Sequence, residues 1–312
     1  RSLMASVPLI EKRLHRFALN EEDNLEDTST GLQYLQEKQT TQDSTNEPLL
    51  EVRNLSKTFY TPSTLLKPKE AFTAVKNVSF SVNRGETVGI VGESGSGKST
   101  IGRMILGLED ITEGSVIYRG KDLKLITDST ERRAHCLSMQ CIFQDPYSSL
   151  NPRMSAGENI TYGLKIHKLI DSKNAKSLAQ DLMVLVGLQR QDADKLPHSF
   201  SGGERQRIGI ARALGYRPDF IFCDEPTSAL DVSVQANLLN LLKDLQEQFS
   251  LTLLFVSHDL AVIRQMCDRV IVMKDGEALE NGSNENIFER PKHAYTRSLL
   301  DAMPKFQGLA QY

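Results

Sequence analysis

The chain has 312 residues and a formal net charge of −3 at pH 7, from 37 Lys or Arg and 40 Asp or Glu side chains. With 39% hydrophobic residues, it is long enough for one large domain or two smaller ones with a sizeable core. This balance excludes a whole-chain attraction for nucleic acid, and no apolar run approaches the ~20 residues that span a bilayer. No basic start leads into an apolar stretch, so we expect no secretory signal.

The first segment, "RSLMASVP" at residues 1–8, is a near copy of "RSLLDAMP" at 297–304. The first residue is Arg, which is compatible with an excerpt from a longer chain. Residues 9–48 follow, and Glu21 to Glu47 contain eight acidic side chains but a single basic one, Lys38. Because so little apolar surface is available there, we predict a flexible acidic linker.

From about Leu49 the sequence predicts alternating strands and helices. "LLEVRNLSKTFY" and "AVKNVSFSVNRGE" alternate apolar and polar residues, whereas "ETVGIVG", "FIFCDEP" and "LTLLFVSHD" are short buried-strand runs. "VSVQANLLNLLKDLQ" has helical spacing, and "RVIVMKDGEALENG" predicts a hairpin turning at Asp275 and Gly276. This order favours an α/β fold with a largely parallel sheet, into which a helical segment of about residues 147–205 is inserted.

The chain's four cysteines do not form a close pair, so we expect reduced thiols that pack as small core hydrophobes.

A glycine-rich stretch, "GESGSGKS", follows a predicted strand and precedes a predicted helix. Its spacing fits a phosphate-binding loop, in which backbone N–H groups and the helix N-terminus face phosphate oxygens. Lys98 would reach the β- and γ-phosphates of a nucleotide, and the Ser99 hydroxyl would bind Mg²⁺. The predicted nucleotide-binding residues are Gly92, Glu93, Ser94, Gly95, Ser96, Gly97, Lys98, Ser99 and Thr100.

Two adjacent carboxylates, Asp224 and Glu225, follow the buried run "FIFC". Open α/β sheets place ligands at the carboxyl ends of their strands. We therefore predict that Asp224 helps to hold Mg²⁺ and that Glu225 is the general base that polarises the attacking water.

A third motif, "SGGERQR" at residues 201–207, is a glycine turn that opens a helix and so predicts a second anion site. In this order after the phosphate loop, it resembles the signature of ATP-binding cassette (ABC) ATPases. The resemblance covers residues 49–304. It implies a P-loop NTPase cassette with a RecA-like core, an antiparallel β subdomain and an inserted helical subdomain. Residues 305–312 would be a C-terminal tail.

The resemblance also implies roles for individual residues. In this family the signature, here Ser201, Gly202, Gly203 and Glu204, contacts ATP held by a partner cassette. Glu204 stands where the family usually has Gln, and we expect its carboxylate to turn away from the phosphate. Gln144 matches the loop glutamine that contacts Mg²⁺ or water, and His258 matches the switch histidine beside the γ-phosphate. Phe59 matches the aromatic residue that stacks on adenine, with Tyr60 adjacent, and the dimer-interface loop is Ser228, Ala229, Leu230 and Asp231.

Two further patterns resemble the oligopeptide, dipeptide and nickel importers of the family. They are "QDPYSSLNPRM" at 144–154 and the tail "RPKHAYTRSLL" at 290–300, in which Ala294 replaces the usual proline. Some members hold an iron–sulfur cluster near this tail, but the last cysteine here is Cys267, so we expect none. Because residues 1–8 resemble the end of such a cassette, the chain is expected to contain the tail of a first cassette and all of a second.

The resemblance therefore implies an ATPase that uses ATP and Mg²⁺ to energise import of peptides or related small solutes. The implied partners are a second cassette, which is fused or belongs to a homodimer or heterodimer, two transmembrane permease subunits and, indirectly, an extracytoplasmic solute-binding protein, but no nucleic acid. The implied location is the cytoplasmic face of the cell membrane, as a peripheral subunit. Two alternatives stay open: a double-cassette ATPase that acts on ribosomes or DNA, and a regulatory cassette that binds ATP without hydrolysis.

Overall fold

The computed structural model describes residues 16, 33–35, 47–60 and 70–302. These residues divide into two compact units. The helical unit comprises residues 16, 33–35 and 134–251, and the phosphate-loop unit comprises residues 47–60, 70–133 and 252–302. The predicted cassette tail at 1–8, most of the predicted linker and the C-terminal tail at 305–312 lie outside the described residues.

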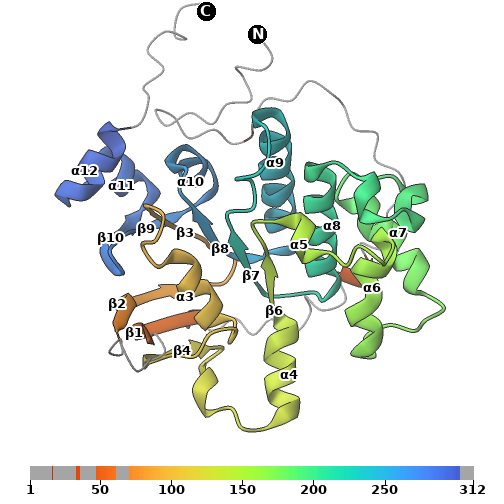
Figure 1. Cartoon of the computed structure of the whole chain (residues 1–312), viewed down its shortest axis with the longest axis horizontal. Coiled ribbons are helices and arrows are strands. Elements are labelled where there is room, and N and C mark those ends of the chain that lie inside the picture. The colour runs from red at the N-terminus through yellow and green to blue at the C-terminus, as the bar shows by residue number, and fades with distance from the viewer. Residues whose placement is uncertain (1–15, 17–32, 36–46, 61–69, 303–312) are drawn as a thin grey trace, which may run out of the picture. The chain divides into compact units, whose positions relative to one another are not determined.

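An antiparallel sheet forms one part of the phosphate-loop unit (Figure 1). Its strands, in sheet order, are β2 (Ala71–Val82), β1 (Leu50–Tyr60), β4 (Glu113–Tyr118) and β5 (Lys121–Asp122). The alternating pattern predicted for β1 is present on each side of an irregularity, with Leu50 and Val52 buried before it and Leu55 and Lys57 buried after it. This sheet confirms the antiparallel subdomain that the family resemblance implies.

A second sheet of the same unit carries the phosphate loop. Its order is β10 (Glu277–Ser283), β9 (Arg269–Lys274), β3 (Thr87–Gly92) and β8 (Thr252–Ser257). All residues of β3 and β8 are buried, as their apolar runs predicted, and β3 pairs in parallel with both β8 and β9. β9 and β10 form the predicted antiparallel hairpin, with Asp275 and Gly276 at positive φ in the turn.

Five helical segments complete the phosphate-loop unit. They are α3 (Lys98–Ile105), η2 (Leu123–Leu125), α10 (Leu260–Met266), α11 (Asn284–Glu289) and α12 (Ala294–Asp301). α3 begins at the phosphate loop and buries Ile101, Met104 and Ile105, while it contacts β2, β3 and β8. The loop is thereby held between a buried strand and a buried helix face.

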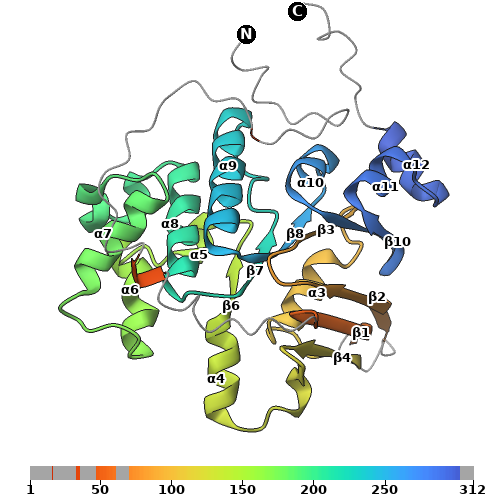
Figure 2. The ribbon, with the colours of Figure 1, turned by 180° about the vertical axis from the view of Figure 1, so that it is seen from behind.

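The helical unit contains a parallel strand pair and most of the helices (Figures 1 and 2). α4 (Ser129–Ser138) leads into it, and β6 (Met139–Ile142) pairs with β7 (Phe220–Asp224). The remaining elements are α5 (Pro146–Ser149), α6 (Ala156–Ile166), α7 (Ala175–Leu185), η3 (Arg190–Asp194), η4 (Pro197–Ser199), α8 (Gly202–Gly215) and α9 (Val232–Phe249). α6, α7 and α8 pack against one another, and α8 also contacts α9.

A short part of the predicted linker contacts the helical unit. Tyr34 donates a hydrogen bond to the carbonyl of Gly215 at 3.0 Å, and the Arg217 guanidinium lies 4.1 Å from the centre of the Tyr34 ring. Leu35 is buried, and Arg16 forms ion pairs with acidic residues of α9. The acidic composition that predicted a flexible linker did not predict these contacts.

The cysteines are divided between core and surface. Cys223 and Cys267 are buried and are not part of a disulfide, as expected, but Cys136 is exposed and Cys141 is half-buried. The expectation that all four pack in the core was therefore wrong for Cys136, which lies on the solvated helix α4, and for Cys141, which is only half-buried in β6. Among the described helices, none combines the length and the apolar character that a membrane span requires.

Candidate functional site

The phosphate loop connects β3 to α3, as its sequence predicted. Gly97, the residue that caps α3, has a φ of 96°. A Cβ atom at this position would lie 2.4 Å from the carbonyl oxygen of Ala74, so both the conformation and the close approach require glycine. The loop is consequently pressed against β2 while its chain turns into the helix.

Lys98 is held by the loop itself. Its side chain is only 5% exposed, and Nζ donates hydrogen bonds to the carbonyls of Gly92 at 2.9 Å and Glu93 at 2.8 Å. The hydroxyl of Ser96 is buried with no hydrogen-bond partner among the described residues. A buried cation and an unused donor at the start of a helix are groups that suit an anionic ligand.

His258 directly follows β8. The parallel register pairs Val91 of β3 with Ser257 of β8, so the phosphate loop and His258 leave the sheet at the same edge. His258 is exposed, and the next residue, Asp259, caps α10 by accepting hydrogen bonds from the backbone N–H groups of Ala261 and Val262. The sheet therefore brings the predicted switch histidine to the phosphate-loop edge.

Phe59 lies near the end of β1 with 38% of its surface exposed, opposite Phe72 of β2. The ammonium of Lys57 lies 4.9 Å from the centre of the Phe59 ring, and Lys57 is fixed by an ion pair of 2.6 Å with Glu109. A partly exposed aromatic ring on a hydrogen-bonded β-strand can stack on a nucleotide base. Its neighbour Tyr60 is 56% exposed.

In the helical unit, β6 and β7 bring Gln144 and Glu225 together. Ile142 pairs with Cys223, so the second residue beyond each pair lies at the same level of the sheet edge. Gln144 Nε2 donates a hydrogen bond of 3.4 Å to Glu225 Oε2. Glu225 has a φ of 46°, an uncommon conformation for a residue with a Cβ, and Asp224 beside it is buried.

The signature motif opens α8 with a capping box. Ser201 Oγ accepts a hydrogen bond from the Glu204 backbone N–H, and the Glu204 carboxylate accepts one of 2.7 Å from the Ser201 N–H. The carboxylate thus folds back onto the helix start. The capping box does not use the backbone N–H groups of Gly202 and Gly203, which leaves them at a positively polarised helix end.

The loop Ser228–Asp231 connects the end of β7 to α9. Ser228 donates to the Glu225 carbonyl at 3.1 Å, and Asp231 caps α9 by accepting a hydrogen bond of 3.1 Å from the Val234 N–H. The Val234 N–H, and then the Ser233 hydroxyl, lower the pKa of the Asp231 carboxyl below its usual value. Ala229 is exposed and Leu230 is half-buried in this loop.

The predicted residues are thus distributed over the two units. The phosphate-loop unit holds Phe59, the loop from Gly92 to Thr100, and His258, whereas the helical unit holds Gln144, Asp224, Glu225, the signature and the Ser228–Asp231 loop. One contact to the loop was missed by the sequence interpretation: Tyr295 of α12 donates a hydrogen bond to Glu93. The sequence pattern at 290–300 contains Tyr295 but does not indicate a partner for it.

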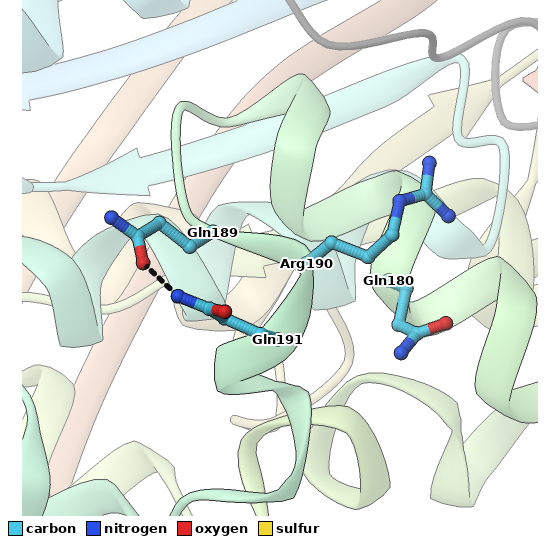
Figure 3. Close-up of a pocket in the computed structure, with 4 residues that line it drawn as sticks. All are labelled: Gln180, Gln189, Arg190 and Gln191. Atoms are coloured by element: carbon cyan, nitrogen blue, oxygen red, sulfur yellow. Dashed lines mark hydrogen bonds between the residues drawn. The ribbon is translucent and has the colours of Figure 1, made fainter.

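A pocket of about 530 Å³ in the helical unit does not include any predicted residue (Figure 3). It is lined by Gln180, Gln189, Arg190 and Gln191. Gln191 donates a hydrogen bond of 2.7 Å to Gln189 (Figure 3). Arg190 forms an ion pair of 2.6 Å with the buried Asp181. Three of the four lining residues thus have polar partners, and the lining contains none of the predicted site residues.

Comparison with known proteins gives one consistent result. Residues 75–228 match the family model described as "ABC transporter". The oligopeptide transport ATP-binding protein OppF of Bacillus subtilis is 46% identical over 259 residues, which cover 83% of each chain. A relative from Brucella ovis, provisionally named as a peptide import ATP-binding protein, is 49% identical over 83% of this chain and 80% of its own.

Solved structures give the same result. A post-hydrolysis dimer of the ATP-binding cassette MJ0796, bound to ADP and Pi, superposes with a TM-score of 0.66 at 32% identity. The match covers 75% of this chain and 98% of that chain. The chain therefore belongs to the ABC transporter family, as an ATP-binding cassette and ATPase with the P-loop NTPase fold.

Proposed function

We propose that this ATPase energises the import of peptides or related small solutes across the cytoplasmic membrane. The observation that carries the proposal is the placement of Glu225, which directly follows buried Asp224 at the end of β7 and accepts a hydrogen bond from Gln144. Both relatives carry peptide-transport names and align over more than four fifths of this chain, which favours an importer over a ribosome- or DNA-acting cassette.

Nucleotide binding would begin at the phosphate loop. Lys98 Nζ donates hydrogen bonds to two carbonyls of its own loop. When ATP binds, the ammonium would instead contact the β- and γ-phosphate oxygens. The Ser96 hydroxyl and the N–H groups at the start of α3 would donate to the same phosphates. Phe59, whose ring is contacted by Lys57, would stack on the adenine.

Hydrolysis needs a water molecule that is activated close to the γ-phosphate. Glu225 would accept the water proton as general base, while Gln144 orients the carboxylate and His258 contacts the γ-phosphate. The hydroxyl of Ser99, the carboxylate of Asp224 and the Gln144 side chain are hard oxygen donors that fit Mg²⁺. When bound, this ion offsets negative charge on the transferred phosphoryl group.

The described residues hold no cluster of three or more His, Cys, Asp or Glu side chains that could bind a metal ion. A magnesium ion bound here would therefore take most of its ligands from the nucleotide and from water.

The signature motif implies a partner. A second cassette would place its nucleotide against Ser201, Gly202 and Gly203, with Ser228–Asp231 at the interface, and we propose a second copy of this chain as the simplest such partner. Two transmembrane permease subunits would anchor the cassettes at the cytoplasmic face, and an extracytoplasmic binding protein would supply the solute. That residues 1–8 form the end of a preceding cassette stays a prediction.

The first test replaces Glu225 by Gln, which keeps the shape and the hydrogen bond to Gln144 but removes the base. We expect ATP binding to stay within about twofold and turnover to fall by about 10²–10⁴-fold, the usual contribution of a general base. ATP hydrolysis and ATP binding of the purified chain are the two measurements. Glu131→Gln, on the solvated helix α4, is the control that should leave both unchanged. Hydrolysis at the parental rate would show that Glu225 is not the base.

The second test addresses import. The Glu225→Gln variant, trapped with ATP and isolated from its native cells, should bring down two polytopic membrane proteins and associate with the membrane fraction. Recovery of ribosomal subunits without a membrane protein would overturn the importer proposal and favour the translation-factor alternative.

A further inference from the structure

The tail pattern at 290–300 is not used by the nucleotide chemistry described so far, although the structure gives its residues defined contacts. His293 caps α12, since its Nδ1 accepts a hydrogen bond of 3.1 Å from the Tyr295 N–H. Glu280 of β10 accepts hydrogen bonds from the backbone N–H groups of Lys292 and His293 at 2.8 and 3.1 Å. The entry to α12 is therefore fixed to the sheet that carries the phosphate loop.

Tyr295 projects from this anchored helix to the phosphate loop. Its hydroxyl donates a hydrogen bond of 3.0 Å to Oε1 of Glu93, the second residue of the loop. The ammonium of Lys274, at the end of β9, lies 4.6 Å from the centre of the Tyr295 ring. The Tyr295 ring thus contacts the Lys274 ammonium, and its hydroxyl binds the Glu93 carboxylate.

Glu93 is bound from a second direction through its backbone. Its carbonyl accepts hydrogen bonds from Lys98 Nζ at 2.8 Å and from the Ser96 N–H at 3.2 Å. A single loop residue therefore links the C-terminal helix, through its side chain, to the phosphate-binding lysine, through its carbonyl.

We propose that Tyr295 is a positioning residue for nucleotide binding, which acts through Glu93. Its hydroxyl fixes the Glu93 carboxylate toward α12 and so keeps this negative charge away from the phosphates that Lys98 binds. This proposal rests on the ATP-binding role of the loop, and it gives the C-terminal pattern a function within the same site.

The ionisation of Tyr295 is consistent with a permanent donor. Burial raises the pKa of its hydroxyl first, and the nearby Glu93 carboxylate raises it further. The hydroxyl thus remains protonated throughout the neutral and mildly alkaline range and stays a hydrogen-bond donor there.

The experiment compares ATP binding by Tyr295→Phe and by Glu93→Gln, singly and together, in the full chain carrying Glu225→Gln. Tyr295→Phe frees the carboxylate, and we expect the Kd for ATP to rise about fivefold to tenfold, in the upper range of a typical hydrogen bond. Glu93→Gln removes the charge, so adding Tyr295→Phe to it should change Kd less than twofold. Tyr162→Phe, which removes an exposed hydroxyl on α6, is the matched control.

A second variant does not disturb α12. Glu93→Asp shortens the carboxylate by one methylene and should raise Kd as Tyr295→Phe does, although Tyr295 is present. An unchanged Kd in both Tyr295→Phe and Glu93→Asp would overturn the proposal. An equal loss from Tyr295→Phe with and without Glu93→Gln would also overturn it, because it would show a general effect of the tail. Failure of the parent chain to bind ATP would instead refute the nucleotide site itself.

Discussion

At the scale of single residues, Glu204 both caps α8 and places a negative charge near the proposed nucleotide contact. It occupies the third position of α8, and its carboxylate completes the capping box by accepting the Ser201 N–H. Negative charge at a helix start is favourable, but the same helix start is the proposed contact for a partner's nucleotide. Turning the carboxylate back onto the backbone stabilises the helix without fully removing the charge from the site.

Replacing Glu204 by Gln separates these two effects. The amide oxygen can still accept the Ser201 N–H, so the cap persists, while the repulsion of the γ-phosphate disappears. We expect the KM for ATP in steady-state hydrolysis to fall about twofold to fivefold. The free energy of unfolding should drop by no more than about 1 kcal/mol, the value of a charge at a helix end. An unchanged KM would show that the carboxylate does not act on the nucleotide.

The sequence predicted which residues belong to the site better than it predicted their conformations and contacts. The pair Asp224 and Glu225 was recognised because a buried apolar run precedes it, but the positive φ of Glu225 left no mark in the sequence. The link from Gln144 to Glu225 joins residues 81 positions apart, and it follows from the register of β6 with β7, which only the folded sheet defines. The contact of Tyr295 with Glu93 is similarly a product of packing.

At the scale of elements, the hydrophobic periodicity of the sequence predicted those strands and helices that contain many apolar residues. β3, β8 and α9 were predicted because their buried residues follow a strand or helix spacing. The interpretation did not identify α4 as a helix, since only Ser138 of its ten residues is buried and no apolar stripe marks it. Short strands such as β5, with two residues, carry too little pattern for any sequence-based prediction.

Capping offers a prediction for α9. Asp231 accepts the Val234 N–H and the Ser233 hydroxyl. Asp231→Ala should therefore lower the free energy of unfolding by about 0.5–2 kcal/mol, whereas Asp231→Asn, an equally good cap, should change it little. Urea unfolding followed by circular dichroism at pH 7 measures both variants. An equal loss in both would show that the negative charge, rather than the cap, stabilises the helix.

The same cap has a defined pH dependence. The pKa of Asp231 is lowered in the folded chain, so the ionised carboxylate adds stability that is fully present above the unfolded value of about 3.9. This contribution is lost as the pH falls through the lowered folded pKa. The stability difference between the parent and Asp231→Asn should therefore stay constant from pH 7 to about pH 5 and shift toward the Asn variant below about pH 4. A difference that is flat down to pH 3 would contradict the lowered pKa.

At the scale of the whole molecule, the predicted site residues come from both compact units, and the chain alternates between the units along its length. Composition and motif order were sufficient to predict an ABC cassette, because each motif follows its own strand or opens its own helix. The division into units was not visible, since the boundaries at 133/134 and 251/252 fall where nothing in the local composition changes.

The role of the signature can be tested on the assembled molecule through Ser201. Asp and Asn cap helices as well as Ser does, so Ser201→Asp and Ser201→Asn should both preserve the start of α8. Only the Asp variant adds a carboxylate where the nucleotide of a second copy is proposed to bind. In the Glu225→Gln background with ATP and Mg²⁺, light scattering should therefore find a dimer for the parent and for Ser201→Asn, and a monomer for Ser201→Asp.

ATP binding to each variant's own phosphate loop is the internal control, because that loop lies in the other unit and should be unaffected. A dimer of Ser201→Asp as stable as that of Ser201→Asn would show that the N-terminus of α8 does not face a phosphate. A parent that stays monomeric with ATP bound would show that the second cassette is not another copy of this chain.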